Sequence, residues 1–275
     1  MSDLTAGFSA APPEGPGAGR STALELRGID MHYGYVRALD GIDIEVRRGE
    51  VLGLLGDNGA GKSTLLKVMS GVHQPTNGEI RVHGAAAVFH SPADSTHAGI
   101  QMVYQDLALV DAQDIATNLG LGREILRRGP LGWLGFVDHK AQRRRSTAEL
   151  DKLGVRTAAV TRPVEMLSGG QRQVVALARA ATRVTGARSG ILLLDEPTAA
   201  LGYEQTQQVQ ALIRRLADQG VACVLVTHNL PLAMEVCDRI AVLNRGKKVA
   251  DVAAGETDND QLVGWITGAR PSMFA

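Results

Sequence analysis

The sequence has little of what would place a chain in a special class. Its 275 residues include only two cysteines, Cys223 and Cys237, and lysine plus arginine equals aspartate plus glutamate at 29 each. Two cysteines at this spacing supply too few ligands for a metal site, and a chain without an export signal favours free thiols over a disulfide. The balanced overall charge gives no indication of a nucleic-acid partner or of an acidic membrane surface.

Long apolar segments are also missing. The longest clean apolar runs are Ile191–Leu194 and Val221–Val226, whereas a bilayer-spanning helix takes roughly 20 apolar residues. Runs this short are typical of buried strands, so any association with a membrane is expected to be peripheral. Residues 1–22 are rich in alanine, proline and glycine and lack the pattern of a signal peptide, which predicts a disordered tail.

Strand and helix patterns alternate along the rest of the chain. The apolar run Val51–Leu55 leads through a glycine-rich turn into a helix predicted over Lys62–Ser70. Further strands are predicted at Ile191–Leu194, Val221–Val226 and Ile240–Leu243, with helical patterns between them. This alternation predicts an α/β fold with a mostly parallel sheet covered on both faces and a cofactor at the carboxyl ends of its strands.

Two parts of the chain depart from that alternation. Near the N-terminus, Ile42, Ile44 and Val46 alternate with polar residues, which favours a half-buried antiparallel strand. Residues 106–165 hold few β-branched runs and are interpreted as a mainly helical insert. The cluster Arg143–Arg145 within it is typical of a solvated helix face, with nucleic-acid binding as a minor alternative.

The glycine-rich turn fits the phosphate-loop pattern G-x-x-x-x-G-K-S/T. Its glycines let several backbone N–H groups face one anion, and the following helix adds the positive end of its dipole. Lys62 would bring a positive charge to the β- and γ-phosphates of a nucleotide, and the Ser63 hydroxyl would ligate Mg²⁺. A purely structural turn would require neither residue. The predicted nucleotide-binding residues are Gly56, Asp57, Asn58, Gly59, Ala60, Gly61, Lys62, Ser63 and Thr64.

The strand Ile191–Leu194 ends in two carboxylates, Asp195 and Glu196. Asp195 is placed to hold Mg²⁺, as in other phosphate-loop ATPases. Glu196 follows it directly and is the candidate general base that polarises the attacking water. The structural alternative is an acidic strand end that leads into the turn at Pro197.

The pentapeptide Leu167-Ser168-Gly169-Gly170-Gln171 resembles the signature of the ABC ATPase family. In that family Ser168, Gly169, Gly170 and Gln171 would bind the γ-phosphate of ATP held by the opposite subunit. The resemblance therefore implies a self-complementary, head-to-tail homodimer with two ATP molecules at its interface. It also implies a RecA-like core with an N-terminal antiparallel β portion and an inserted α-helical subdomain.

Three further positions match the family in the expected order. Tyr33 matches the aromatic ring that stacks on adenine, Gln105 the glutamine that senses Mg²⁺ and the γ-phosphate, and His228 the histidine that contacts the γ-phosphate. Each would be unremarkable alone, as a packed tyrosine, a surface glutamine or a histidine at a strand end. The family implies that the catalytic residues are Lys62, Gln105, Glu196 and His228, and that the Mg²⁺ ligands are Ser63, Gln105 and Asp195.

The resemblance divides the chain into five segments. Residues 1–22 are expected to form the disordered tail, residues 23–104 and 176–255 the ATP-binding core, residues 105–175 the helical signature subdomain, and residues 256–275 a C-terminal tail.

One position departs from the family pattern. Most members carry an aspartate where this chain has Gly202, which supplies no carboxylate for contacts across the dimer that link the two ATP sites.

Several segments resemble the ATPases of monosaccharide importers, in the subtype with one ATPase domain per chain that includes fructose importers. They are residues 56–58, 104–110, 121–124, 199–202 and 228–231. The branch implies a peripheral location on the cytoplasmic face of the inner membrane, a transmembrane sugar permease that residues 106–122 would contact, and indirectly an extracytoplasmic sugar-binding protein. Nucleic acid is not an expected partner.

Two other functions are alternatives to transport. A soluble ABC ATPase of DNA repair would carry long coiled coils, and a ribosome-associated one would carry two fused ATPase domains. Neither feature is present in this sequence. A regulatory module that does not hydrolyse ATP would be expected to lack Asp195 or Glu196, and both are present.

Overall fold

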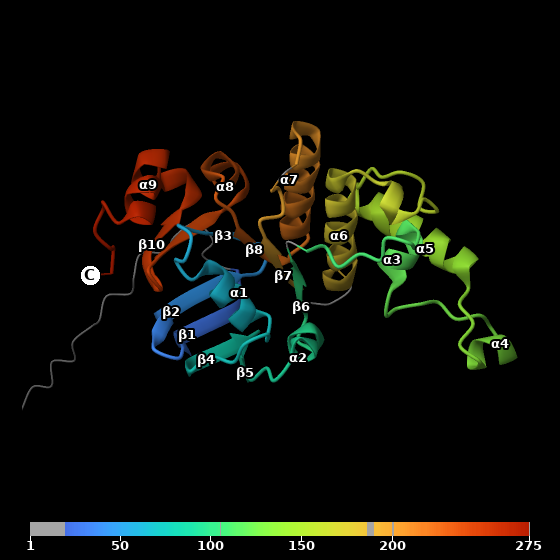
Figure 1. The fold of residues 1–275 in the computed structure, drawn as a ribbon, viewed down its shortest axis with the longest axis horizontal. Coiled ribbons are helices and arrows are strands. Elements are labelled where there is room, and N and C mark those ends of the chain that lie inside the picture. Colours follow the sequence, from blue (N-terminus) through green and yellow to red (C-terminus); the bar gives the residue numbers. More distant parts are fainter. Residues whose placement is uncertain (1–19, 105, 186–189, 200, 275) are drawn as a thin grey trace, which may run out of the picture.

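The computed structural model describes residues 20–104, 106–185, 190–199 and 201–274. Two β-sheets lie against each other, and a group of helices extends from one side of them (Figure 1). The α/β class that the sequence predicts is confirmed. Among the described residues, no helix has the length and apolar character needed to span a bilayer.

The smaller sheet is antiparallel and has the strand order β2-β1-β4-β5. Its strands are β1 (Thr22–Tyr33), β2 (Val36–Arg47), β4 (Asn77–Val82) and β5 (Ala85–Ala87). The alternating residues Ile42, Ile44 and Val46 of β2 are all buried, as their pattern predicts. This sheet is the N-terminal antiparallel portion of the fold.

The larger sheet has the strand order β10-β9-β3-β8-β7-β6 and is parallel except for its edge strand β10. Its strands are β3 (Val51–Gly56), β6 (Ile100–Val103), β7 (Ile191–Asp195), β8 (Ala222–Val226), β9 (Arg239–Asn244) and β10 (Lys247–Ala253). In β7, Leu192 and Leu194 face one apolar cluster while Leu193 faces the other. The central strands are therefore buried on both faces, which explains their unbroken apolar runs.

Helices cover both faces of the larger sheet. One face packs against α6 (Gly169–Val184), α7 (Tyr203–Asp218), α8 (Leu230–Val236) and α9 (Asn259–Thr267), and the other against α1 (Lys62–Met69) and the smaller sheet. The short helix α2 (Pro92–His97) precedes β6. Cys223 and Cys237 are buried free thiols, as predicted, and burial raises the pKa of Cys223 to about 12.

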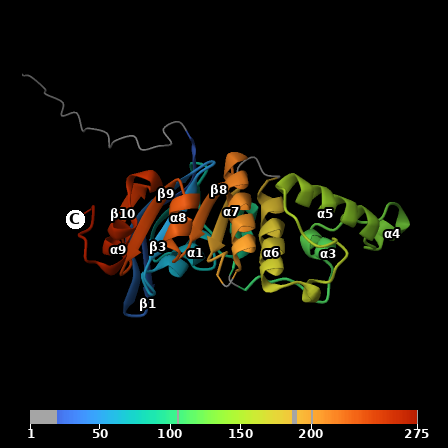
Figure 2. The ribbon, with the colours of Figure 1, turned by 90° about the horizontal axis from the view of Figure 1, so that it is seen from above.

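The remaining helices form a helical part beyond α6 (Figure 2). They are α3 (Ile115–Gly120), α4 (Pro130–Trp133) and α5 (His139–Leu153). The side chain of Asp138 caps α5 at its start, and Gly154 ends it in the left-handed conformation that glycine favours. The side chain of Ser168 caps α6, whose far end reaches back to the sheet.

Two predicted segment boundaries need correction. Residues 256–275 are not a tail, because α9 lies within them and buries Leu262 and Trp265 in the core. The boundary at residue 175 falls inside α6, which is one continuous helix from Gly169 to Val184. At the N-terminus, β1 begins at Thr22, and residues 1–19 of the predicted tail lie outside the described residues.

Candidate functional site

The phosphate loop runs from the end of β3 to the start of α1 and requires glycine at both of its ends. Gly56 has a φ of +151°, and a Cβ there would overlap the carbonyl oxygen of Leu243. Gly61 has a φ of +106°, and a Cβ would lie 2.9 Å from the carbonyl oxygen of Ala38. The loop is thus seated against β9 and β2, and only residues without a Cβ allow that approach.

Lys62 is the first residue of α1, and its side chain folds back over the loop. Its Nζ donates to the carbonyl oxygens of Gly56 at 2.8 Å and Asp57 at 2.9 Å. Burial lowers the pKa of Lys62, while the carboxylates of Glu196, Asp57 and Asp195 act in the opposite direction. A buried ammonium held only by carbonyl oxygens is available for a stronger, anionic partner.

The two carboxylates at the end of β7 differ in their surroundings. Burial raises the pKa of Asp195, and the neighbouring Glu196 raises it further, against the opposing charge of Lys62. Glu196 has a φ of +49°, and its backbone N–H donates to Val226 of β8 at 3.0 Å. Its side-chain Oε1 lies 3.1 Å from Nδ1 of His228. The fold therefore brings Lys62, both carboxylates and His228 together from distant parts of the sequence.

Lys62, Asp195 and Glu196 line an open cleft of about 420 Å³, and His228 lies beside it through its contact with Glu196. The cleft is lined by Asn58, Gly59, Gly61, Lys62, Ser63 and Thr64 of the phosphate loop and α1, together with Asp195 and Glu196. Gly56, Asp57 and Ala60 shape the loop without lining the cleft: the backbone N–H of Ala60 donates to the carbonyl of Asp57 at 3.1 Å.

The cleft also contains residues that the sequence analysis missed. Val36, Arg37 and Ala38 of β2 line it, as do Arg245 and Gly246 of the turn between β9 and β10. Arg37 is paired with Asp30 at 2.7 Å and Asp40 at 2.6 Å. No local motif marks these residues, because they reach the cleft only through the packing of β2 and the β9–β10 turn against the loop.

The donor set of the cleft fits a magnesium ion. The hydroxyl of Ser63 and the carboxylates of Asp195 and Glu196 all line it, and oxygen atoms of this kind are the ligands that Mg²⁺ takes. Burial and the neighbouring Glu196 raise the pKa of Asp195, and the charge of a bound cation would oppose both effects. Gln105, the third predicted ligand, lies outside the described residues.

Other predicted residues lie away from the cleft. The ring of Tyr33 is not among its lining residues and packs edge-on against His73, with ring centroids 5.6 Å apart. Ser168 and Gln171 cap the start of α6: the backbone N–H of Ser168 donates to Gln171 Oε1 at 3.1 Å, and the backbone N–H of Gln171 donates to Ser168 Oγ at 3.3 Å. Ser168, Gly169 and Gln171 are exposed. One chain therefore does not bring this segment to its own cleft, and the role of Tyr33 stays a prediction.

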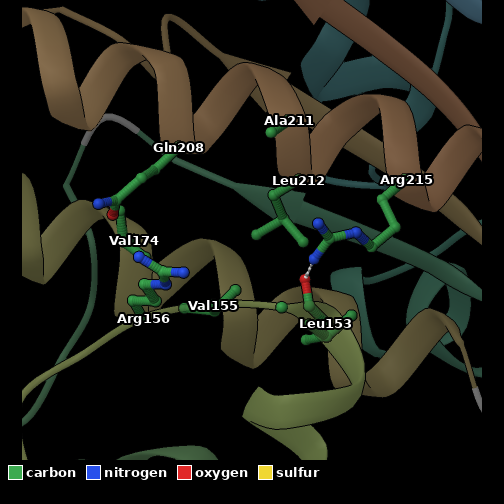
Figure 3. A pocket seen from close by; sticks show the side chains of 9 residues that line it. Leu153, Val155, Arg156, Val174, Gln208, Ala211, Leu212 and Arg215 are labelled. Atoms are coloured by element: carbon green, nitrogen blue, oxygen red, sulfur yellow. Dashed lines mark hydrogen bonds between the residues drawn. The ribbon is translucent and has the colours of Figure 1, made fainter.

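A second cavity, of about 320 Å³, lies at the seam between α5 and α7 (Figure 3). Arg215 of α7 donates to the carbonyl oxygen of Leu153 at the end of α5, and Gly154 leaves no room for a Cβ beside that guanidinium. Arg156 and Gln208 line the same cavity. No predicted site residue lines this cavity, and the hydrogen bond from Arg215 to Leu153 connects the helical part to the core.

Comparison with known proteins places these features in one family. A family profile described as "ABC transporter" matches residues 39–199. The chain is 42% identical to the fructose import ATP-binding protein FrcA of Rhizobium meliloti, over 90% of this chain and 94% of that one. It is 40% identical to the xylose/arabinose import ATP-binding protein XylG of Sulfolobus acidocaldarius, with the same coverage. In fold it is similar to a dimeric ATP-binding cassette solved in a post-hydrolysis state with ADP and Pi, with a TM-score of 0.68, 24% identity, and coverage of 84% of this chain and 98% of that one.

Proposed function

The chain belongs to the ABC transporter family and is one of its ATPases, and from that premise we propose that it hydrolyses ATP to drive the import of a monosaccharide. The observation that carries the proposal is the cleft in which Lys62, Asp195 and Glu196 meet beside the phosphate loop. The import ATP-binding proteins to which it is similar act on fructose, xylose and arabinose by their names, which supports a monosaccharide as the cargo.

Lys62 begins the proposed reaction by exchanging partners. Its ammonium leaves the carbonyl oxygens of Gly56 and Asp57 for the β- and γ-phosphates, a charge-assisted contact stronger than the neutral ones it replaces. The backbone N–H groups of the loop and the start of α1 bind the same phosphates. Ser63, Asp195 and Gln105 would hold Mg²⁺, which neutralises charge that develops on the phosphate oxygens.

Glu196 is the proposed general base. It orients a water molecule for attack on the γ-phosphate and takes its proton. Its left-handed backbone, held by the hydrogen bond from Glu196 N–H to Val226, fixes where the carboxylate points. His228, at 3.1 Å from that carboxylate, positions it and then contacts the γ-phosphate.

A second copy of the chain would complete the site. Ser168, Gly169, Gly170 and Gln171 are proposed to bind the γ-phosphate held by the partner, and two facts support this. The start of α6 is a ready-made anion site, and its exposed residues are not used by the chain's own cleft. Closure of the two chains around ATP can do work only if ATP binds the closed dimer more tightly than the open one.

The permease is proposed to contact residues 106–122. A groove of about 220 Å³ lies between β6 and α6, and Leu107 and Ala108 form part of its wall. Arg179 of α6 donates to the carbonyl oxygens of Leu107 at 2.9 Å and Ala108 at 2.8 Å, so movement of α6 would carry this segment with it. Such a permease places the chain at the cytoplasmic face of the membrane, with the sugar-binding protein on the other side.

The test is affinity purification of tagged Glu196→Gln chain from solubilised native membranes with ATP present. The expected companion is a multi-span permease, because the variant keeps ATP and should stay closed on its partner. The matched control is Lys62→Ala, which should recover much less permease under the same conditions. Ribosomal proteins, nucleic acid or no membrane protein in the Glu196→Gln sample would instead support a soluble ABC ATPase and overturn the importer proposal.

A further inference from the structure

An apolar tip projects from the helical part. Residues 125–138, here called the arm, connect the region after α3 to α5 and contain α4. Figures 1 and 2 both show α4 at the end of the molecule farthest from β10 and the C-terminus. Trp133 is 97% exposed and Leu134 73% exposed, and the large apolar side chains exposed on the arm are Leu126, Leu131, Trp133, Leu134 and Phe136. Large exposed apolar side chains gathered in one short segment are typical of an interaction site.

The arm has a defined shape that presents these side chains outward. Its two ends pair through a bridge between Leu126 and Val137, and Arg127 N–H donates to the carbonyl of Phe136 at 2.8 Å. The N–H of Phe136 in turn donates to the carbonyl of Leu131 at 3.0 Å. Gly132 packs directly on the carbonyl of Arg127, where a Cβ would not fit. The apolar tip is therefore held out by the backbone.

The charge beside the tip is positive, although the whole chain is balanced. Arg127 and Arg128 are exposed, and the described residues give neither guanidinium a carboxylate partner. The two nearby acids make backbone hydrogen bonds and no ion pair with these arginines: Glu124 accepts from Gly122 N–H at 2.9 Å, and Asp138 accepts from Ala141 N–H at 2.9 Å. The tip thus combines exposed aromatic and leucine side chains with two arginines that, among the described residues, form no ion pair.

The base of the arm is fixed to the proposed permease face. Arg123 donates to the carbonyl of Thr182 at 3.0 Å, and Arg183 donates to the carbonyl of Leu121 at 2.8 Å. Arg183 also lines the groove between β6 and α6 that is proposed to receive the permease. The arm therefore extends sideways from the edge of that groove.

We propose that the arm is a membrane contact: Trp133, Leu134 and Phe136 enter the headgroup region of a bilayer while Arg127 and Arg128 pair with the phosphates of anionic lipids. Tryptophan at the boundary between headgroups and acyl chains, with arginine beside it, is the chemistry of interfacial anchors. The proposal rests on the proposed function for the presence of a membrane beside the groove.

A lipid surface fits the tip better than a second protein does. The arm projects as a narrow hairpin whose largest side chain is almost fully exposed, and none of the cavities at the cleft, the groove or the seam is lined by residues of the arm. A protein partner would bury a broad complementary patch, whereas a bilayer accepts a small convex tip.

The test uses the full chain and vesicles made of equal parts phosphatidylcholine and phosphatidylglycerol. Binding is measured by co-sedimentation and by the shift of Trp133 emission, obtained by subtracting the spectrum of Trp133→Ala. Trp265, the other tryptophan, is buried in both samples. The expected result is a blue shift with anionic vesicles, and a loss of affinity of roughly tenfold or more for Trp133→Ala. Phosphatidylcholine vesicles alone should bind more weakly, and added salt should reduce the difference.

The controls separate this proposal from the proposed function. Arg127→Glu with Arg128→Glu should lose preference for anionic vesicles, whereas Arg144→Glu, an exposed arginine of α5, should keep it. All variants should hydrolyse ATP at the wild-type rate, since the arm is remote from the cleft. Equal vesicle binding by the wild-type chain and Trp133→Ala, or crosslinking from position 133 to the permease in place of lipid, would overturn the lipid contact while leaving the ATPase assignment intact.

Discussion

The two segments of this chain that are proposed to bind phosphate are built very differently. The phosphate loop is anchored at both ends: Gly56 and Gly61 pack against neighbouring strands, and Lys62 is buried over the carbonyls of the loop. In the segment from Ser168 to Gln171 every residue but the half-buried Gly170 is exposed, and the hydrogen bonds between its two end residues form within the segment itself. The fold therefore preorganises the phosphate loop, while the segment from Ser168 to Gln171 is accessible to a partner molecule. This contrast is what a site shared between two chains requires.

The largest expected effect is that of Lys62→Ala in the phosphate loop. Removing the ammonium from the phosphates should reduce ATP hydrolysis at least about hundredfold, because a preorganised charge at the transferred group is a main source of rate. Phosphate release measures this effect, and Lys152→Ala, at an exposed lysine of α5, is the matched control. Retention of more than a tenth of the wild-type rate would show that Lys62 does not act on the phosphates.

Glu196→Gln should separate binding from hydrolysis. The amide keeps the size of the side chain and cannot take a proton, so we expect nucleotide binding to persist while turnover falls about hundredfold. The exposed segment of one chain should then stay on the ATP of the other, which light scattering would detect as an ATP-dependent dimer. Wild-type turnover in this variant would mean that another group is the base.

Gly56→Ala tests whether the phosphate loop requires glycine where it packs against β9. Its Cβ would meet the carbonyl of Leu243 at a positive φ, so we expect a loss of about 3 kcal/mol in the free energy of unfolding. Gly59→Ala is the matched control, because Gly59 also has a positive φ, of +79°, but no atom within 4 Å of the added Cβ. Urea denaturation of both variants separates the cost of backbone strain from the cost of the clash with the Leu243 carbonyl. Equal losses in the free energy of unfolding would show that this clash does not contribute.

The same contrast explains how much the sequence could predict. The phosphate loop and its flanking elements follow from local sequence patterns. The apolar run Val51–Leu55 lies in β3, and the helix predicted over Lys62–Ser70 is α1 (Lys62–Met69). The cleft residues Arg37 and Arg245 were missed because tertiary packing alone brings β2 and the β9–β10 turn to the loop.

The C-terminal region shows the other limit. The prediction of a C-terminal tail over residues 256–275 is wrong, because the nine-residue helix α9 lies within them. Leu262 and Trp265 anchor it to the core, and Ile266 packs against the same cluster. The spacing of these three residues is that of one helix face, but it covers little more than one turn, which is too short a pattern to identify a helix. The packing surface that selects this helix is formed by distant strands, so it is invisible in the local sequence.

The smallest expected effect is that of a substitution at Gly202. This residue is the N-cap of α7, with φ −72° and ψ 168°, and it offers no side chain to the free N–H groups. An aspartate there would accept one of them, so Gly202→Asp should raise the free energy of unfolding by a few tenths of a kcal/mol. Its Cβ would lie 2.8 Å from Oε1 of Gln205, a movable side-chain end, and Gln205→Ala in the same background removes that contact.

The carboxylate of Gly202→Asp would also restore a group that the family uses across the dimer. We therefore expect the Hill coefficient of ATP hydrolysis to change as well as the stability, and steady-state kinetics over a range of ATP concentrations would measure it. A gain in stability with an unchanged Hill coefficient would show that position 202 acts only as a helix cap in this chain. Communication between the two sites would then depend on other contacts of the exposed segment.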